Sequence, residues 1–312
     1  MCLIASSRRG ISMGKKILII ALFLLFIFGW VTGAISVRER YGDTAILFEG
    51  DSIYNHITVK KEGSLYCMLF GRLRDSRETC IDLNDPDLSV FEYTAMMFVG
   101  FLFHPESKNI CLIGLGGGYI PSLFSRYLPQ VQLQIVEIDP LVVKLAKKYF
   151  NFTLSARQNL AIEDGRLYLR KNAKLFDQIW VDAFNSDYIP AHMTTREFLL
   201  LCKQRLTTHG ILLQNVHGGN QLYDAQVETF RSVFAKVFVF EGERSANRII
   251  VAADRPLYEP PDLWKQGLPF QGKIGKIDLR REAKKYNPKP SIKKAPILTD
   301  DYNPANLMLL RS

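Results

Sequence analysis

The segment from Ile110 to Pro140, ICLIGLGGGYIPSLFSRYLPQVQLQIVEIDP, constrains the fold more than any other part of the chain. Its pattern predicts a buried strand, a glycine-rich turn, a helix and a second buried strand. Two strands joined through a helix run parallel, because the helix returns the chain to the end of the sheet where the first strand began. The segment therefore predicts a parallel sheet with helices packed on its faces.

The alternation of strand and helix continues to residue 216. Apolar runs predict strands at 109–115, 133–139, 160–164, 177–184 and 211–216, and the helical patterns are Pro121–Tyr127, Pro140–Phe150, Leu167–Asn172, Thr195–Leu206 and Asp224–Phe234. Two more strands, at 236–242 and 247–254, lie too close together for a crossover helix, so they must pair antiparallel. A mostly parallel seven-stranded sheet with such a hairpin is typical of the Rossmann-like fold of class I methyltransferases, which use AdoMet.

The chain divides into four predicted parts. Residues 1–37 contain a candidate transmembrane anchor, and residues 38–104 hold short β-rich runs and one helix from Leu88 to Phe103. The β-rich runs predict a small antiparallel subdomain. Residues 105–256 form the predicted nucleoside-binding catalytic domain, and residues 257–312 form a basic C-terminal extension.

The anchor is predicted from Ile17 to Val37, a run of 21 residues without a charge. A helix of this length extends about 31 Å, enough to cross a bilayer. A cleaved signal peptide is the alternative, but the run is longer than a usual signal and Trp30 lies near one end, where interfacial aromatic residues belong. We expect a single-pass anchor in a bacterial inner membrane, and the sequence leaves open which side carries the domain.

The formal net charge of +9 is concentrated in two segments. Residues 265–294 contain ten Lys or Arg and two acids, and four more cations lie before residue 17, so the remainder is slightly acidic. This distribution argues against a nucleic-acid partner, since a binding groove needs cations on the main domain. The basic segment is either a solvated surface or a contact with anionic lipid headgroups.

Five cysteines are scattered through the chain without a C-x-x-C pair, at positions Cys2, Cys67, Cys80, Cys111 and Cys202. The odd number and wide spacing predict neither a metal site nor a disulfide framework. Cys111 and Cys202 lie in apolar runs and are expected to act as small core residues. The histidines His192, His209 and His217 fit no catalytic spacing and are predicted to be loop or structural residues.

The glycine turn is the first candidate for the ligand site, and its residues are Gly114, Gly116, Gly117 and Gly118. Glycine lets the backbone approach a ligand closely, and the start of a helix favours a negatively charged or polarised group. The G-x-G-x-x-G fingerprint of dinucleotide-binding domains is broken, because Tyr119 occupies its last position.

Acidic side chains follow three successive strands, where an open α/β sheet binds its ligand. They are Glu137 and Asp139 after the second strand, Glu163 and Asp164 after the third, and Asp182 after the fourth. A carboxylate can accept hydrogen bonds from ribose hydroxyls or an adenine amino group, although a helix N-cap role is the alternative for Asp139 and Asp164. Burial against Trp180 and Phe184 would raise the pKa of Asp182. Together these acids suit a cationic ligand and no metal.

These segments resemble the spermidine synthases, the polyamine aminopropyltransferases, most specifically in LIGLGGG, VEIDPLVVKLAKKYF, EDGRLYLRK and FDQIWVDAF. The similarity extends from about Asp43 to Phe240. The resemblance implies that Glu137 binds the ribose, that Asp164 binds the adenine and that Asp182 accepts the proton of the attacking amine. It also implies that Asp187 is the second acid of the substrate loop, although at a longer spacing, and Tyr188 beside it is a candidate substrate contact.

The chain departs from the family at two places. Gly117 stands where the family has the aspartate that binds the aminopropyl ammonium, and VFEYTA replaces a Tyr-His-Glu stretch, so Tyr93 is a loose substitute for its substrate-binding tyrosine. The segments DAFNSDYIPAHMTTREF and LTDDYNP are similar to a divergent bacterial branch that is often joined to membrane segments.

The resemblance implies an enzyme of polyamine biosynthesis that moves an aminopropyl group from decarboxylated AdoMet to a small amine. The alternative is a methyltransferase that uses AdoMet itself, because room at Gly117 could admit the carboxylate of that cofactor. A third hypothesis is a membrane-tethered nucleoside-binding protein without catalysis. Members of this family commonly form dimers, so a homodimer is expected.

Overall fold

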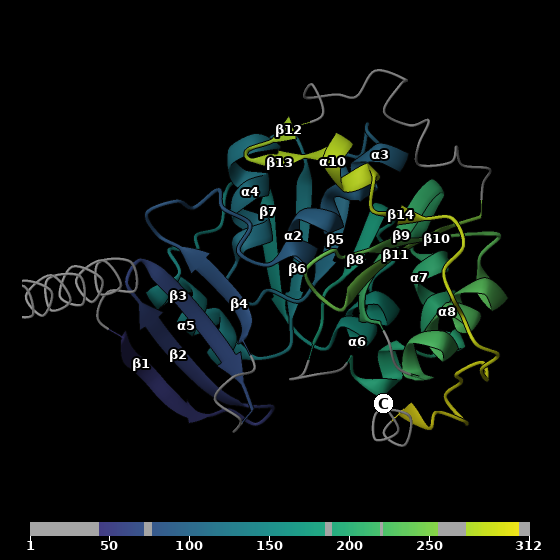
Figure 1. Ribbon diagram of the computed structural model, residues 1–312, viewed down its shortest axis with the longest axis horizontal. Coiled ribbons are helices and arrows are strands. Elements are labelled where there is room, and N and C mark those ends of the chain that lie inside the picture. The colour runs from purple at the N-terminus through teal and green to yellow at the C-terminus, as the bar shows by residue number, and fades with distance from the viewer. Residues whose placement is uncertain (1–43, 72–76, 185–188, 219–220, 255–272, 306–312) are drawn as a thin grey trace, which may run out of the picture.

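The computed structural model describes residues 44–71, 77–184, 189–218, 221–254 and 273–305 (Figure 1). The predicted anchor at 17–37 and the candidate residues Asp187 and Tyr188 lie outside these ranges. Within them, no helix is both long and apolar enough to cross a bilayer.

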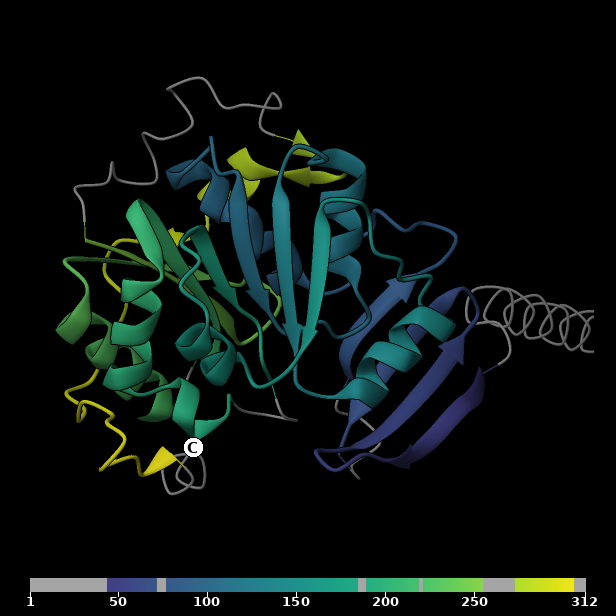
Figure 2. The ribbon, with the colours of Figure 1, turned by 180° about the vertical axis from the view of Figure 1, so that it is seen from behind.

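A four-stranded antiparallel sheet forms the N-terminal subdomain. Its strands follow one another in order: β1 (Thr44–Asp51), β2 (His56–Glu62), β3 (Leu65–Phe70) and β4 (Arg77–Asp82). The sheet covers α5 (Pro140–Tyr149), and the Tyr149 hydroxyl donates to the backbone carbonyl of Leu47 at 3.0 Å (Figure 2). The subdomain therefore packs directly on the larger domain through this helix.

A disulfide between Cys67 and Cys80 joins β3 to β4, so the expectation that the chain holds no disulfide was wrong for this pair. The two residues are direct cross-strand partners, with Cα atoms 4.1 Å apart. Their 13-residue separation has no motif spacing, and only the register of the strands brings the sulfurs together. Cys111 and Cys202 are free thiols and fully buried, as predicted.

The helix predicted from Leu88 to Phe103 forms as three short pieces: α2 (Glu92–Met96), η1 (Met97–Val99) and α3 (Gly100–Phe103). No side chain caps the start of any of them, and nearly every residue is buried. At Gly100 an added Cβ would come within 2.2 Å of the Gln178 side-chain oxygen, so the backbone lies directly on the large sheet. Tertiary packing shapes this segment more than its helical pattern does.

The large sheet has eight strands in the order β14-β10-β11-β9-β8-β5-β6-β7. The parallel strands are β5 (Asn109–Ile113), β6 (Gln132–Glu137), β7 (Gln158–Ile162), β8 (Phe176–Val181) and β9 (Leu206–His217). As predicted, β10 (Lys236–Glu241) and β11 (Asn247–Ala253) are antiparallel. The eighth strand, β14 (Tyr286–Asn287), comes from the C-terminal extension and was not predicted, because two residues leave no periodicity to detect.

Helices cover both faces of the large sheet. On one face lie α2, α3, α5, α4 (Tyr119–Tyr127) and α10 (Leu279–Ala283), with side chains in one hydrophobic core. On the other face lie α6 (Gly165–Lys171), α7 (Arg196–Gln204) and α8 (Gln221–Val233), which share a second core. Trp180 of β8 points into the first core, and its neighbours Ile179 and Val181 point into the second.

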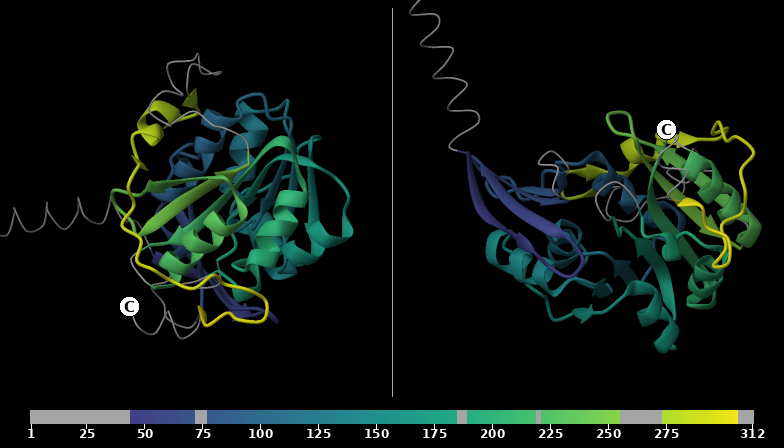
Figure 3. Two further views of the ribbon diagram at one scale, coloured as in Figure 1. Left: turned by 90° about the vertical axis from the view of Figure 1, so that its right-hand side faces the viewer. Right: turned by 90° about the horizontal axis from the view of Figure 1, so that it is seen from below.

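The C-terminal extension returns along the large domain. A short hairpin of β12 (Lys273–Ile274) and β13 (Ile277–Asp278) leads into α10 and β14. Residues 288–305, called the C-terminal strap below, then run almost without regular secondary structure along the outside of the domain beside α8 (Figure 3). Leu298 and Ala305 of the strap are buried against Leu222 and Ala225 of that helix.

Candidate active site

The carboxyl ends of four neighbouring strands meet along one edge of the large sheet. The strands are β7, β6, β5 and β8, and their final residues lie within one residue of the same register. Backbone hydrogen bonds continue one step past the strands, from the Gly114 N–H to Val136 O and from the Asp182 N–H to Ile113 O, each at 2.8 Å. The glycine turn, Glu137 and Asp182 therefore begin at the same level of adjacent strands, as the sequence predicted.

The glycine turn fits tightly between its neighbours. Gly114 has a φ of +104°, and an added Cβ would lie 2.0 Å from the backbone oxygen of Asp182. Any side chain at this position would separate the ends of β5 and β8. Gly116 and Gly118 also have positive φ values, of +54° and +81°.

Gly117 is enclosed by side chains rather than open space. An added Cβ would lie 2.8 Å from Cδ1 of Phe150 and 3.2 Å from Oγ1 of Thr79, which also accepts the Gly117 N–H at 3.3 Å. Thr79 belongs to β4 of the N-terminal sheet. The direction in which the family's aspartate would project is thus filled, and the room that the sequence suggested at Gly117 is not found there.

Glu137 is buried and holds the turn in place. Its Oε2 accepts the Leu115 N–H at 2.9 Å, and its Oε1 accepts the Asp139 N–H at 3.0 Å. Burial raises the pKa of Glu137, and these two hydrogen bonds oppose that rise. Since a carboxylate oxygen has two lone pairs, both oxygens keep the capacity to accept from ribose hydroxyls.

Asp139 caps α5, the alternative role that the sequence left open. Its Oδ1 accepts the Leu141 N–H at 2.8 Å, and the Ser52 hydroxyl donates to Oδ2 at 2.5 Å. Ser52 lies in the turn between β1 and β2, so this bond joins the two subdomains. Sequence patterns gave no sign of Ser52, because 87 residues separate the partners.

Asp164 also caps a helix, and it has a histidine partner. Its Oδ1 accepts the Leu167 N–H at the start of α6, and its Oδ2 lies 2.9 Å from Nε2 of His192. Burial raises the pKa of Asp164, but the hydrogen bonds from His192 and Leu167 outweigh it and hold that pKa below its usual value. His192 was predicted to be a loop or structural residue, and this contact with a candidate site acid was missed. Glu163 instead pairs with Lys171 at the surface.

Asp182, the residue that follows β8, has a strongly shifted pKa. Burial raises its pKa to about 6, against the effect of a hydrogen bond from Nδ2 of Asn215 at 3.0 Å, so the predicted direction of the shift is confirmed. Asn247 in turn donates to Oδ1 of Asn215 at 3.1 Å. The sequence analysis missed Asn215, which lies in β9 one residue after Gln214, the partner of Val181, and is therefore level with Asp182.

The remaining candidate features are Tyr93, a cavity beside α4 and a possible metal site. Tyr93 is half-buried on α2, with its ring 6.1 Å from that of Phe91. A cavity of about 230 Å³ is lined by Phe150, Tyr119 and Arg126 among others, and none of the three strand-end acids Glu137, Asp164 and Asp182 borders it. Within the described ranges, no group of three His, Cys, Asp or Glu side chains is placed to hold a metal ion.

Comparison with known proteins gives consistent results. The sequence profile of the spermine/spermidine synthase domain matches residues 90–241. A polyamine aminopropyltransferase of Vibrio vulnificus (strain CMCP6) is 34% identical over 281 residues, which cover 86% of this chain and 92% of the relative.

Two solved structures share the fold at low sequence identity. A probable spermidine synthase from Corynebacterium glutamicum ATCC 13032 superposes with a TM-score of 0.64 at 18% identity, over 83% of this chain and 98% of that one. A spermidine synthase in complex with the transition state analogue AdoDATO gives a TM-score of 0.64 at 19% identity, over 78% of this chain and 85% of that one.

Proposed function

The chain belongs to the spermidine synthase family of polyamine aminopropyltransferases, and on that premise we propose that it transfers an aminopropyl group from decarboxylated AdoMet to a small amine. The observation that supports this most is the position of Asp182. It directly follows β8, the strand beside the glycine turn, at the level of Glu137, and burial raises its pKa to about 6. A carboxylate of this kind is a better proton acceptor than an ordinary aspartate and is still charged at neutral pH.

In the proposed reaction, the neutral nitrogen of the amine attacks the aminopropyl carbon bonded to the sulfonium. The new C–N bond forms as the C–S bond breaks, and the C–S electron pair leaves with methylthioadenosine. Asp182 accepts the proton that the nitrogen loses. Most of the remaining acceleration would come from holding the nitrogen in line with the C–S bond.

The nucleoside part of the co-substrate would be held by the other two strand ends. Glu137 has free lone pairs for the ribose hydroxyls, and its backbone hydrogen bonds fix it rigidly. Asp164 would accept from the adenine amino group while His192 and the start of α6 hold both of its oxygens in place. The glycine turn brings the backbone close to the sulfonium side of the site. Asp187, Tyr188 and Tyr93 stay predicted substrate contacts.

A methyltransferase that uses AdoMet is the second candidate, favoured by the loss of the ammonium-binding aspartate at Gly117. Phe150 and Thr79 weaken it, because they fill the direction in which an open space for the cofactor's carboxylate was expected. The membership of the family favours transfer over a binding protein without catalysis.

Titration calorimetry with decarboxylated AdoMet and with AdoMet tests the proposal, together with mass spectrometry of the products formed with a panel of diamines. We expect tighter binding of decarboxylated AdoMet and a product heavier than the amine by one aminopropyl group. Tighter binding of AdoMet, with a methylated product, would establish the second candidate instead.

We also propose that residues 17–37 anchor the protein in a bacterial inner membrane. The length and apolar composition of this run support the anchor, and the Cys67–Cys80 disulfide favours an oxidising side for the folded domain. Alkaline carbonate extraction of cell membranes tests attachment, and protease added to intact spheroplasts tests the side. Release of the full chain by carbonate would contradict the anchor. A homodimer also stays a prediction, which light scattering can check.

A further inference from the structure

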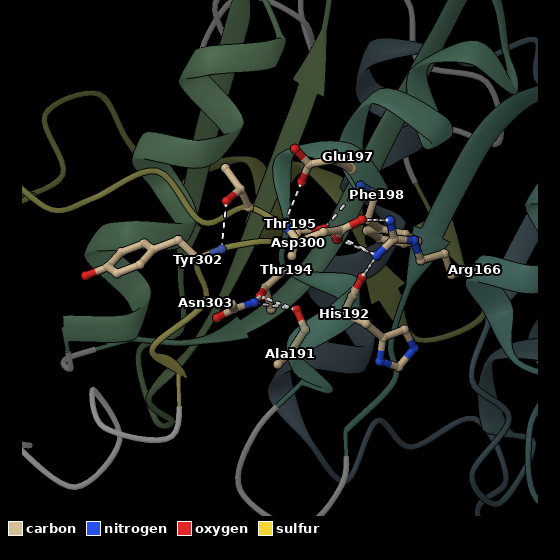
Figure 4. A network of polar contacts seen from close by, with 11 residues as sticks. Arg166, Ala191, His192, Thr194, Thr195, Glu197, Phe198, Asp300, Tyr302 and Asn303 are labelled. Atoms are coloured by element: carbon tan, nitrogen blue, oxygen red, sulfur yellow. Dashed lines mark hydrogen bonds and ion pairs between the residues drawn. The ribbon is translucent and has the colours of Figure 1, made fainter.

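The C-terminal strap forms an ion pair with α6 through Asp300. The guanidinium of Arg166 forms two parallel hydrogen bonds with Asp300, one of them from Nη1 to Oδ1 at 2.7 Å (Figure 4). The Arg166 side chain is only 11% exposed, and it holds the pKa of Asp300 below its usual value. A two-point contact of this kind fixes orientation as well as distance.

The strap also forms hydrogen bonds with residues 191–195, in the segment between β8 and α7. The Thr195 hydroxyl donates to Oδ1 of Asp300 at 2.8 Å. Asn303 donates from its side-chain amide to the Ala191 carbonyl at 2.7 Å and to the Thr194 hydroxyl at 3.1 Å. Residues 191–195 are therefore held from two points of the strap, 105 or more residues further along the chain.

His192 lies within residues 191–195, the segment that the strap holds. Its backbone carbonyl accepts from Nη1 of Arg166 at 2.9 Å, the nitrogen that also donates to Oδ1 of Asp300. Its ring nitrogen Nε2 lies 2.9 Å from Oδ2 of Asp164, two residues before Arg166 in the chain. A continuous series of contacts thus runs from Asp300 through Arg166 and His192 to Asp164.

We propose that the C-terminal strap positions the nucleoside site, with Asp300 and Arg166 holding His192 against Asp164. The proposal rests on the proposed function, because it takes Asp164 to be the acid that binds the adenine amino group. Asp300, Arg166 and His192 are positioning residues, and none of them is given a step in the transfer. The strap lies outside residues 90–241, the part of the chain that the family profile matches.

A contribution to folding stability is a weaker explanation for the Asp300–Arg166 ion pair than a positioning role. Asp300 is 42% exposed, and exposed ion pairs add little stability. Leu298 and Ala305 already bury the strap against α8, and the Leu298 N–H donates to the Thr229 hydroxyl of that helix at 2.9 Å. We therefore expect the strap to stay docked without Asp300. The Arg166 guanidinium, however, would lose the contact that orients it toward the carbonyl of His192.

The test compares Asp300→Asn with Asp301→Asn in the full chain. Asp301 is exposed and makes no hydrogen bond or ion pair with any residue in the described ranges, so it is a matched control. Two quantities are measured: the NMR resonances of the His192 ring, assigned with His192→Gln, and the dissociation constant of methylthioadenosine. Asp300→Asn should shift the ring resonances and weaken binding by about tenfold, while Asp301→Asn should change neither. Arg166→Lys, which keeps the charge but loses the fork, should act like Asp300→Asn.

Unchanged ring resonances and an unchanged dissociation constant in both Asp300→Asn and Arg166→Lys would overturn the proposal. So would a loss of binding that is matched by Asp301→Asn. If either variant fails to fold, the other supplies the measurement. The two proposals also fail separately: a protein that binds no adenine nucleoside would contradict the proposed function, and the His192 resonances would still report whether the strap holds the ring.

Discussion

Asn215 of β9 donates its side-chain amide to Oδ1 of Asp182, the residue that follows β8, at 3.0 Å. The bond stabilises the charged form of Asp182, and burial disfavours it. Burial dominates, so the pKa stands at about 6. Asp182 is therefore ionised at neutral pH but binds a proton more readily than an exposed aspartate, which suits a base that must accept a proton from an amine.

Asp182→Asn should abolish aminopropyl transfer and leave methylthioadenosine binding within about threefold, because only the base is removed. A carboxyl whose pKa is raised on folding binds a proton more tightly in the native state, so its contribution to stability falls as pH rises from about 4 to 6. The variant should thus melt at pH 8 no lower than the wild type. Turnover assays, calorimetry and thermal melting check these outcomes, and retained turnover would remove Asp182 from the mechanism.

The rate of transfer should fall below about pH 6 as Asp182 takes up a proton. Asn215→Leu removes the hydrogen bond that lowers this pKa, so the acidic limb of kcat/KM should move upward by roughly one pH unit. Asn247→Ala, which removes only the donor behind Asn215, should move the limb less. An identical profile in wild type and Asn215→Leu would show that this bond does not tune the base.

Gly117→Ala should lower the stability of the protein by about 1–3 kcal/mol, because the new methyl group meets the buried ring of Phe150. Phe150→Leu should reduce that cost in the double variant, since the ring edge is gone. Denaturant unfolding of the four proteins in this cycle measures the coupling. Additive effects of the two substitutions would mean that the ring does not limit position 117.

Cys67→Ser with Cys80→Ser should lower the stability of the N-terminal sheet by about 3 kcal/mol, the value expected for a disulfide that closes a loop of this length. Reducing agent should lower the melting temperature of the wild type and leave that of the double variant unchanged. Thiol labelling of the native double variant should detect neither Cys111 nor Cys202, because both are buried. An effect of reductant on the double variant would point to another cause.

The periodicity of the sequence was enough to predict most of the large sheet. Alternating strands and helices gave the five parallel strands, and the short link before 247–254 required the antiparallel pair. Local chemistry gave the helix starts as well, since Asp139 and Asp164 cap α5 and α6 from residues adjacent to them in the chain. Each of these features depends on residues that are neighbours in sequence.

Contacts between segments that are distant in the chain could not be predicted from periodicity or from neighbouring residues. The sequence placed acids at the strand ends, but only the folded chain brings Ser52 to Asp139, Thr79 to Gly117, His192 to Asp164 and Asp300 to Arg166. The Cys67–Cys80 bond likewise depends on the register of β3 and β4. Hydrophobic spacing specifies which face of an element is buried, whereas the partner of a polar side chain is set by how whole elements pack, and that packing leaves no local pattern in the sequence.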